Sequence, residues 1–523
     1  MTKIKKVGDH DVIDYMARDY DSLLLSMREI IPEKLPEWID YESEADFGNV
    51  LLQVFAHMGD ILSYYQDRIA NESFLGTART RRSIIHHLGL ISYRLSTAAP
   101  SSTTVTLTVP ADKNDLITIV KGNAFATKSQ KDKPVVRFEY TAEETLRIDC
   151  SALPENNGKK YFKGIPVEEG RLVLNEVLGV SDGRPNQKYP LIHKNLILRS
   201  LGIGSQINKD LIILSRLGDT TEEWVLQESL VFSREGQRDY IIEINENDQA
   251  SIIFGDGAFG AIPKNGAEIR ATYRVGGGEL GNVPQNTIET IVDAPQLTLL
   301  GAKITNPKPA SGGSDRESIN HAVKHAPNVF RSFKRSVTAE DYKALAMNFN
   351  GVGKLRAEAT NWNTVTLFVA PEGGGTVSDI FRANLLAYFE DKRPLSTIIE
   401  IEDADYVKIY IKAEVGIESY YSPENIKEKV SGAVANLLAF KKVDFEDTLY
   451  LSKFYEAIED IEGVKYVTIK RFTREADLEN HIDENGIIAM GVNEIPRIPN
   501  DSDDDQEYAR GIFIEELTTT GGI

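Results

Sequence analysis

The sequence predicts a multidomain α+β protein with an N-terminal helical segment, a central β-rich domain that carries an inserted subdomain, and a C-terminal α+β domain. Three observations predict this class. Apolar residues recur at helical spacing between 20 and 95, and they alternate with polar residues along short runs between 103 and 275. Strand-like and helix-like runs then alternate between 353 and 472. The 523 residues leave room for roughly three or four domains.

These patterns divide the chain into five expected regions. They are a helical region at 1–96, a β-rich domain at 97–306 with an insertion near 141–235, a linker with short helices at 307–350, an α+β domain at 351–475 and a tail at 476–523. We expect the α+β domain to place its helices on one face of a small sheet.

The composition restricts the classes of partner. The formal net charge is −20, so the phosphate backbone of a nucleic acid would repel the chain, and we expect no nucleic-acid partner. The single cysteine, Cys150, excludes an intramolecular disulfide and fits a chain folded in a reducing cytoplasm. No run approaches the roughly 18 apolar residues that span a bilayer, and the start has no apolar signal region. We therefore expect no membrane insertion.

The N-terminal region should contain three helices. The first ends at Pro32, the second covers 46–70 and the third covers 80–90. The second helix carries more apolar surface than a three-helix segment can cover, and exposed surface of that kind marks an interface. The interface residues we predict on it are Phe47, Val50, Leu51, Val54, Phe55, Met58, Ile61, Leu62 and Tyr65.

A glycine-rich stretch from 252 to 284 is the most informative part of the central domain. It holds eight glycines in 33 residues, and glycine provides the positive φ and close backbone approach that other residues do not. Residues 255–260 match the dinucleotide-binding pattern G-x-G-x-x-G, but Pro263 and Gly266 follow where that site needs a helix. We therefore interpret the stretch as two strands joined and followed by glycine turns.

This structural signature comprises Phe254, Gly255, Asp256, Gly257, Gly260, Pro263, Gly266, Tyr273, Gly276, Gly277, Gly278, Gly281 and Asn282. Asp256 could act as a catalytic base or a metal ligand. A short carboxylate between glycines is also typical of a turn, where it accepts hydrogen bonds from nearby backbone amides. We favour the turn.

The region after 306 should begin with a linker. Its prolines and glycines predict a hinge at Pro307, Pro309, Gly312 and Gly313. Ser314 should cap a helix limited by Pro327, and Thr338 should cap a second helix that runs to Asn348. Strands are expected at 355–357, 365–370, 406–415 and 464–470, and helices at 378–390, 423–440 and 452–458.

Several groups could bind a ligand but match their motifs poorly. His321 and His325 are spaced i and i+4 for one metal, without the glutamate of a zinc-protease helix, and the adjacent His86 and His87 point in different directions. Asp501, Asp503 and Asp505 alternate as in a calcium loop but lack its glycine and bidentate glutamate. The three glycines at 373–375 precede the helix expected at 378, so an anion could bind at the N-terminus of that helix. A flexible connector is the simpler interpretation of these glycines. We therefore predict no catalytic residue, no cofactor and no metal site, and we expect that the protein is not an enzyme.

Four groups of residues resemble the baseplate J-like family, whose members are wedge subunits of contractile phage tails and related injection machines. The N-terminal group includes D-F-G-N-V-L-L-Q-V-F-A-H-M-G-D, and the central group includes F-G-D-G-A-F-G-A-I-P-K-N-G and Y-R-V-G-G-G-E-L-G-N-V. The matching segments are 46–60 with 64–65 and 72–78, then 254–266 with 273–283, then 312–318, and finally 336–342.

This resemblance implies a structural baseplate wedge protein. Such a protein would assemble in the bacterial cytoplasm, join the baseplate ring around the central hub and rearrange when the tail contracts. Its implied partners are other copies or a paralogue of itself, other wedge proteins, and hub and sheath-proximal proteins, with the helix at 46–70 in an inter-subunit bundle and 353–472 in ring contacts. A carbohydrate-binding or carbohydrate-active β protein remains the competing hypothesis, supported by the β-rich centre, Trp224 and scattered acids.

Overall fold

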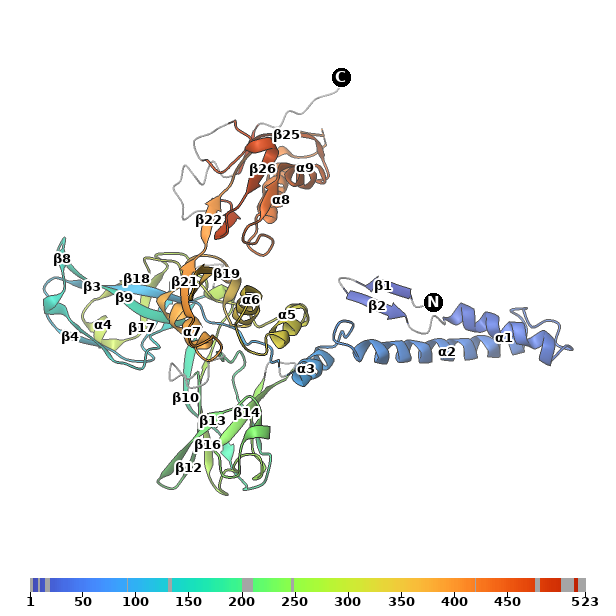
Figure 1. Ribbon diagram of the computed structural model, residues 1–523, viewed down its shortest axis with the longest axis horizontal. Helices are drawn as coiled ribbons and strands as arrows, with labels where there is room; N and C mark the ends of the chain where they lie inside the picture. Colours follow the sequence, from blue (N-terminus) through green and yellow to red (C-terminus); the bar gives the residue numbers. More distant parts are fainter. Residues whose placement is uncertain are drawn as a thin grey trace. The chain divides into compact units, whose positions relative to one another are not determined.

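The computed structural model describes residues 3–7, 10–14, 19–91, 93–129, 134–199, 210–245, 249–418, 420–475, 480–499 and 512–515. The chain forms two compact units, and each is described by itself (Figure 1). Unit 1 comprises Met1–Leu95 and Ser318–Arg331, and unit 2 comprises Ser96–Glu317 and Ser332–Ile523. The predicted fold class is confirmed: helices dominate the N-terminal part, strands the centre, and helices with small sheets the C-terminal part.

Unit 1 is mainly helical. Its elements are the hairpin β1 (Lys3–Val7) and β2 (His10–Asp14), α1 (Tyr20–Lys34), α2 (Phe47–Glu72), α3 (Arg81–Leu90) and α5 (Ile319–Arg331). Asp19 caps α1 by accepting a hydrogen bond from the Ser22 amide, and Asp46 caps α2 in the same way. The helix α1 continues through Pro32 to Lys34, two residues beyond its predicted end. Periodicity did not predict β1 and β2, because strands of five residues contain too few alternations.

Unit 2 contains a sheet that we call the host sheet. Its strand order is β17-β5-β6-β9-β3-β18, with β8 paired to β9, and the short pair β4 and β7 lies beside it in sequence. Val105, Phe125, Phe138 and Ile165 are fully buried in its core. The bounds are β3 (Ser102–Pro110), β4 (Leu116–Ile119), β5 (Ala124–Thr127), β6 (Arg137–Glu139), β7 (Leu146–Asp149), β8 (Glu155–Asn156), β9 (Lys159–Glu169), β17 (Ile288–Asp293) and β18 (Lys303–Thr305).

A second sheet, the inserted sheet, lies in sequence between β9 and β17 of the host sheet. Its order is β10-β16-β12-β13-β14-β15-β11. The predicted insertion at 141–235 differs from this sheet at both ends, because β9 pairs with β3 of the host sheet while β15 and β16 pair within the insertion. The bounds are β10 (Arg171–Val180), β11 (Lys188–Pro190), β12 (Leu211–Leu217), β13 (Thr220–Leu226), β14 (Asp239–Ile244), β15 (Ala250–Phe254) and β16 (Glu268–Val275).

The C-terminal half of unit 2 holds several small sheets instead of the single sheet that the sequence predicted. A three-stranded sheet, β19-β20-β21, is followed by a lobe with the sheets β22-β27, β25-β23-β28 and β24-β26. The bounds are α4 (Pro295–Leu299), α6 (Ala339–Met347), β19 (Val352–Asn361), β20 (Thr364–Pro371), α7 (Asp379–Phe389), β21 (Ile398–Asp403), β22 (Asp405–Lys408), β23 (Tyr410–Ile417), α8 (Pro423–Leu437), β24 (Thr448–Tyr450), α9 (Leu451–Glu459), β25 (Val464–Thr473), β26 (Ile487–Ala489), β27 (Glu494–Arg497) and β28 (Ile512–Glu515).

The helix expected to begin at Ser314 begins instead at Ile319, and Pro327 lies inside it. Tertiary pairing explains the later start. The backbones of Ser314 and Ala99 exchange two hydrogen bonds, and the Glu317 amide donates to the Ser96 carbonyl. Residues 314–317 therefore extend along the host domain and are not available for the first helical turn.

The core of the inserted sheet generates a stability prediction. Phe254 is fully buried, and its ring centroid lies 4.6 Å from that of Trp224 and 5.9 Å from that of Tyr189. We expect Phe254→Ala to lower the free energy of unfolding by about 3–5 kcal/mol through lost burial and the cavity left behind. Urea unfolding followed by tryptophan fluorescence measures the change.

Phe259→Ala is the matched control, because Phe259 follows in the same stretch but is half exposed. Its effect should stay within about 1 kcal/mol. Equal losses from the two substitutions would contradict the assignment of Phe254 to the core.

Candidate interface helix and glycine junction

The structure leaves the predicted interface residues of α2 in solvent. All nine side chains, from Phe47 to Tyr65, keep between 41% and 76% of their surface exposed. Monomeric proteins rarely expose apolar surface in so continuous a stripe. Within unit 1, α2 therefore presents an apolar face that other described residues of the chain leave largely open.

The contact between α1 and α2 lies on the other side of α2. The buried residues of α2 are Asn49, Ala56 and Asn71, which at 100° per residue point roughly opposite to the apolar stripe. Asn49 accepts a hydrogen bond from Arg28 at 2.8 Å and donates to the Ser43 carbonyl at 2.9 Å. Polar and small residues thus join α1 to α2, and the large apolar side chains remain outward.

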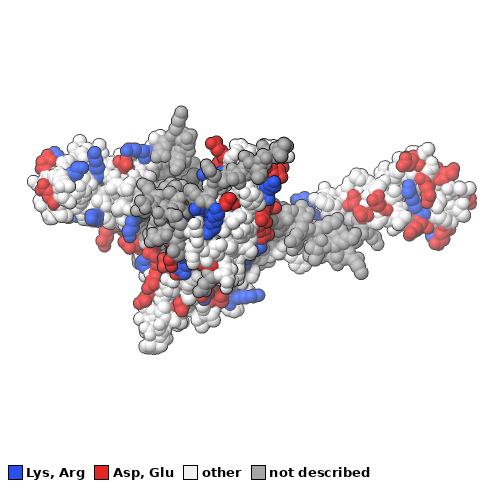
Figure 2. Space-filling model, turned by 90° about the horizontal axis from the view of Figure 1, so that it is seen from above, with Lys and Arg blue, Asp and Glu red and all other residues white. Residues whose placement is uncertain are grey.

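Acidic side chains gather where α1 turns into α2, as the red cluster at the tip of unit 1 shows (Figure 2). The connecting segment, 35–46, contributes five of them, namely Glu37, Asp40, Glu42, Glu44 and Asp46. Much of the α2 stem lacks charged side chains in the same view. The unit therefore separates a charged tip from an apolar stem.

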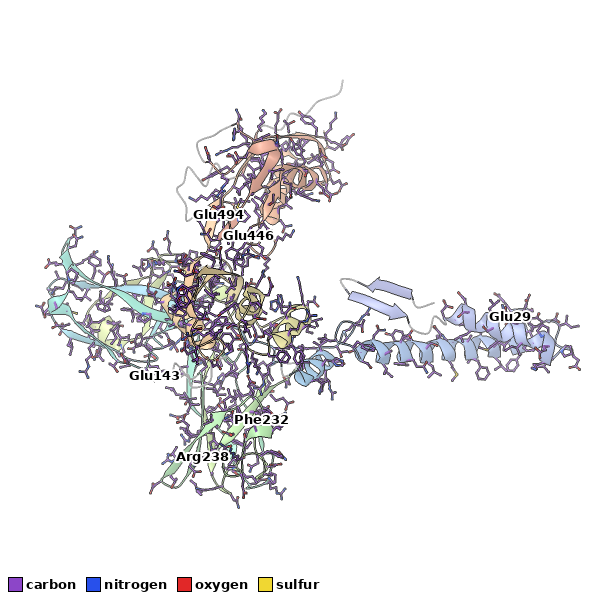
Figure 3. The ribbon with its side chains drawn as sticks, viewed as in Figure 1. Glu29, Glu143, Phe232, Arg238, Glu446 and Glu494 are labelled. Atoms are coloured by element: carbon purple, nitrogen blue, oxygen red, sulfur yellow. The ribbon has the colours of Figure 1, made fainter. Side chains whose placement is uncertain are left out.

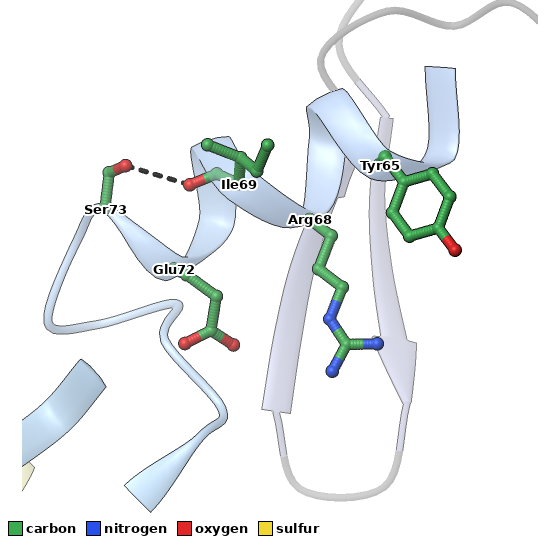
Figure 4. A pocket seen from close by; sticks show the side chains of 5 residues that line it. All are labelled: Tyr65, Arg68, Ile69, Glu72 and Ser73. Carbon is green, nitrogen blue, oxygen red and sulfur yellow. Dashed lines mark hydrogen bonds between the residues drawn. The ribbon is translucent and has the colours of Figure 1, made fainter. Parts of the chain in front are cut away.

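A shallow pocket lies at the C-terminal end of α2, lined by Tyr65, Arg68, Ile69, Glu72 and Ser73 (Figure 4). The Ser73 hydroxyl donates to the Ile69 carbonyl at 2.8 Å. The Glu72 carboxylate accepts hydrogen bonds from the amides of Arg79 and Thr80, which directly precede α3. Burial raises the pKa of Glu72, but hydrogen bonds from Ser83, Thr80 and Arg79 outweigh it and lower that pKa. The hydrogen bonds of the Glu72 carboxylate thus connect the end of α2 with the start of α3.

The first part of the glycine-rich stretch forms a tight turn after β15. The Asp256 carboxylate is half-buried and accepts hydrogen bonds from the amides of Ala258 and Phe259, at 2.9 and 2.7 Å. The amide of Phe259, followed by that of Ala258, holds the pKa of Asp256 below its usual value. A Cβ on Gly255 would lie 2.4 Å from the Phe259 carbonyl oxygen, so this position requires glycine. Asp256 serves the backbone of its own turn.

The second part, residues 276–282, lies where the subdomains of unit 2 meet, and we call it the glycine junction. The Gly277 amide donates to the Glu169 carboxylate at 2.7 Å, and the Gly281 carbonyl accepts from the Ser101 hydroxyl at 2.5 Å. A Cβ on Gly276 would lie 2.8 Å from the Cα of Gly170. These contacts join the junction to the host sheet and to the start of the inserted sheet.

The same junction also contacts the C-terminal half of unit 2. The Asn282 side chain donates to the Gly313 carbonyl at 2.7 Å and accepts from the Gly313 amide at 2.8 Å. Glu279 pairs with Lys441 of the C-terminal lobe at 2.6 Å, and the Glu279 amide donates to Asp315. Seven consecutive residues therefore connect the host sheet, the inserted sheet and the C-terminal half.

The predicted hinge segment is buried and hydrogen-bonded at its C-terminal end. Pro307 and Pro309 are exposed, but Gly312 and Gly313 are buried. The Ser311 amide donates to the Ser102 carbonyl, and its hydroxyl donates to the Thr376 carbonyl at 2.6 Å. A hinge role for this segment stays a prediction, and bending there would break these bonds.

A buried charge cluster lies beside the junction. Arg199 contacts both Glu168 and Asp210, at 2.7 and 2.6 Å, while Arg274 lies 3.6 Å from Glu139 and donates to the Glu169 carbonyl. Burial raises the pKa of Glu169 to about 7, although the Gly277 amide and Arg274 lower it, and Glu139 adds to the rise. The sequence did not identify this cluster, because its members come from separate strands.

The weaker candidate groups gain little support. The rings of His321 and His325 stack 4.0 Å apart, and the parts of the chain that the structure describes hold no group of three or more side chains suited to a metal. His87 is bonded to the Glu72 carbonyl at 2.8 Å. At the start of α7, the Val377 amide donates to Asp403, a carboxylate of the same chain. Asp501, Asp503 and Asp505 lie outside the described residues.

Among the described helices, none combines the length and apolar character that crossing a membrane requires.

Two family models match the chain. Residues 19–90 match the N-terminal domain of bacteriophage baseplate proteins, and residues 334–402 match the baseplate J-like central domain. The first match covers α1 to α3 with the apolar stripe, and the second covers α6 to β21.

The chain is also similar to curated proteins. It is 21% identical over 403 residues to the baseplate wedge protein gp6 of Enterobacteria phage T4, which covers 74% of this chain and 59% of the relative. It is 30% identical over 124 residues to the uncharacterised protein YqbT of Bacillus subtilis (strain 168), which covers 22% of this chain and 35% of that one. The chain thus spans less than two thirds of either relative.

Among solved structures, a chain of the anti-feeding prophage baseplate, determined by cryo-EM, aligns over 90% of both chains at 10% identity. Its TM-score of 0.32 is too low to establish a common fold.

The helical unit with the open apolar stripe and the segment from α6 to β21 are thus the two parts of the chain that match baseplate domains. These matches agree with the resemblance to the baseplate J-like family that the sequence carries.

The glycine junction generates a second prediction. Gly277 has a φ of 83°, and a Cβ there would lie 2.7 Å from the Ala98 Cβ, whereas Gly122 has a φ of 93° and open space around it. Both alanine variants should lose about 1–2 kcal/mol from the left-handed backbone, and Gly277→Ala should lose at least ~1 kcal/mol more from the clash. Thermal and urea unfolding of the pair measure the difference, and equal losses would show that crowding at the junction is unimportant.

The raised pKa of Glu169 generates a third testable prediction, on the pH dependence of stability. The native pKa of about 7 exceeds the ordinary value of 4.5, so the native state binds this proton more tightly than the unfolded state does. The stabilisation is complete below pH 4.5 and is lost as the pH rises to about 7. Glu169→Gln should remove this loss, so its free energy of unfolding relative to wild type should rise by about 1–3 kcal/mol between pH 5 and 8.

Urea unfolding at a series of pH values measures the effect. The control is Glu143→Gln, because Glu143 belongs to the host domain but its side chain is 60% exposed and pairs with Lys121 (Figure 3). Parallel pH profiles for wild type and Glu169→Gln would contradict the burial of this carboxyl.

Proposed function

We propose that this protein is a structural wedge subunit in the baseplate of a contractile tail or injection machine. It acts mechanically and without catalysis: it assembles in the bacterial cytoplasm, takes its place in the ring around the hub and rearranges when the tail contracts. The observation that carries the proposal is the exposed apolar stripe of α2, which lies within the segment that matches baseplate N-terminal domains.

The apolar stripe of α2 favours a partner that also presents an apolar helical surface. Burying one exposed leucine or phenylalanine gains about 1.5–3 kcal/mol, so covering several of the nine side chains would drive stable association. Helices with a broad apolar face associate with one another in bundles. We propose other copies or a paralogue of this chain as the direct partner of α2, with other wedge, hub and sheath-proximal proteins as further neighbours in the assembly.

The carbohydrate hypothesis loses its main support. Trp224, the aromatic residue on which it relied, keeps 3% of its surface exposed and packs against Phe254. Its indole nitrogen donates to the Ser215 hydroxyl at 2.9 Å. This side chain is therefore part of the inserted sheet's core and cannot stack on a sugar without unfolding it.

Replacing three apolar side chains of the stripe tests the proposal. The variant Leu51→Gln, Phe55→Gln, Leu62→Gln changes three exposed positions on one side of α2, so the helix should persist. We expect at least a tenfold weaker self-association, or weaker association with co-expressed wedge proteins, and loss from assembled particles. Sedimentation velocity and the composition of purified particles are the measurements.

A matched triple variant in unit 2, Leu116→Gln, Leu174→Gln, Leu217→Gln, alters three other exposed leucines. It should associate through α2 as wild type does. If the α2 variant keeps its helical circular dichroism and still assembles at the wild-type level, the role of the stripe is refuted. A wild-type chain that is absent from particles would refute the wedge assignment itself.

A further inference from the structure

The host sheet and the inserted sheet have separate apolar cores. The host core is built from residues such as Phe125 and Phe138, whereas the inserted core is built from Trp224, Tyr240 and Phe254. Two bodies with separate cores can move relative to each other without exposing either core. What joins them therefore decides whether the inserted sheet is fixed or movable.

Three glutamates of the host sheet provide the acceptors at this joint. Glu139 accepts a hydrogen bond from the Leu172 amide at 2.9 Å, and Glu168 accepts from Arg199 at 2.7 Å. Glu169 accepts from the Gly277 amide at 2.7 Å. Each donor belongs to the inserted segment or to the residues that directly follow it. The Thr97 hydroxyl adds a neutral pair of hydrogen bonds with the backbone of Leu198, at 3.1 and 3.0 Å. Three of the hydrogen bonds that join the two sheets thus end on carboxylates.

The chain passes between the two sheets at two places, which lie side by side. It leaves β9 through Gly170 and returns from β16 through Gly276, and a Cβ on Gly276 would lie 2.8 Å from the Gly170 Cα. The φ angles of Gly170, Gly276 and Gly277 are 117°, 139° and 83°, which few other residues adopt. We call these paired crossings the neck. Glycine pairs of this kind absorb changes of backbone angle with little steric cost.

The charges around the neck do not balance when every group is ionised. The acidic groups are Glu139 on β6, Glu168 and Glu169 on β9, and Asp210 before β12, and the basic groups are Arg137 on β6, Arg199 after β11 and Arg274 on β16. The uncharged residues Ser101 and Gly281 also lie next to Glu169, and Glu279 is paired with Lys441. Arg137 also lies 4.0 Å from Asp293 on β17, whose side chain is mostly exposed to water. Apart from this exposed group, four carboxylates thus face three guanidinium groups.

We propose that the inserted sheet pivots on this neck and that one proton, held by Glu169 within the glutamate cluster, keeps it in the closed orientation that the structure shows. The inference goes beyond baseplate assembly, because the pivot belongs to the single chain.

The chemistry of the cluster explains the direction of the switch. With Glu169 protonated, the other three carboxylates of the cluster balance the three guanidinium groups. The unprotonated oxygen of the Glu169 side chain still accepts a hydrogen bond from the Gly277 amide. Loss of the proton leaves an uncompensated charge beside Glu139 in a partly desolvated site, which is costly. Opening the neck hydrates Glu169, and the separate cores survive the movement. The pKa of about 7 places this change near neutral pH.

A distance measurement across the neck tests the proposal. Spin labels at Asp219→Cys, in the exposed turn between β12 and β13, and at Asp112→Cys, in the exposed turn after β3, report the orientation of the two sheets. The native Cys150 is buried and should not label. The full-length labelled chain is diluted in excess unlabelled chain, so that only distances within one molecule contribute. We expect a second distance population to grow between about pH 6 and pH 8, with a midpoint near pH 7.

Two variants discriminate the mechanism from a general effect of pH. Glu169→Gln should keep the low-pH distance at about pH 6 and at about pH 8. Glu143→Gln should behave as wild type, because Glu143 lies outside the cluster. An unchanged distance distribution in wild type across this range overturns the proposal without any variant. A pH-dependent shift that persists in folded Glu169→Gln overturns the assignment of the proton to Glu169.

Discussion

The structure of unit 2 depends on the hydrogen bond between the Gly277 amide and the Glu169 carboxylate, and on the close approach of Gly276 to Gly170 beside it. At this point the inserted sheet leaves and rejoins the host sheet, and the following residues reach the C-terminal half through Asn282 and Glu279. A side chain on any of the three consecutive glycines would meet an atom at 2.9 Å or less, namely at Gly170, Ala98 or Asp315. The glycines therefore permit three subdomains to converge on one short segment.

Unit 1 follows a different physical rule. Its helices are joined by a polar contact, with Asn49 between Arg28 and Ser43, while large apolar side chains of α2 stay outward. A helix that reserves its apolar side in this way is suited to association, because its partner gains the burial that the single chain does not provide. Unit 2 buries its apolar residues in cores of its own. One chain thus combines a helical unit that leaves its apolar face open with a body that holds several apolar cores of its own.

Local patterns predicted much of the fold. The helix predicted at 46–70 appears as α2, the β-rich centre is present, and the helices predicted at 378–390 and 423–440 appear as α7 and α8, because each has a clear apolar period. Short strands such as β21 and β24 were missed, since a few residues contain too little alternation to recognise. The helix predicted at Ser314 began late because Ser314 and Glu317 found backbone partners at Ala99 and Ser96, and no local rule reveals a partner more than two hundred residues away.

The sequence by itself determined the resemblance to the baseplate J-like family, the apolar stripe of α2 and the demand for glycine after Phe254, because these depend on residue types at short spacing. Only the tertiary structure decided which side of α2 remains open, where the inserted sheet begins and ends, and what the glycines of the junction approach. It alone gathered Glu139, Glu168 and Glu169 with arginines from other strands into one buried cluster. Charge balance and desolvation depend on distances between segments remote in the chain, and those distances exist only once the sheets have paired.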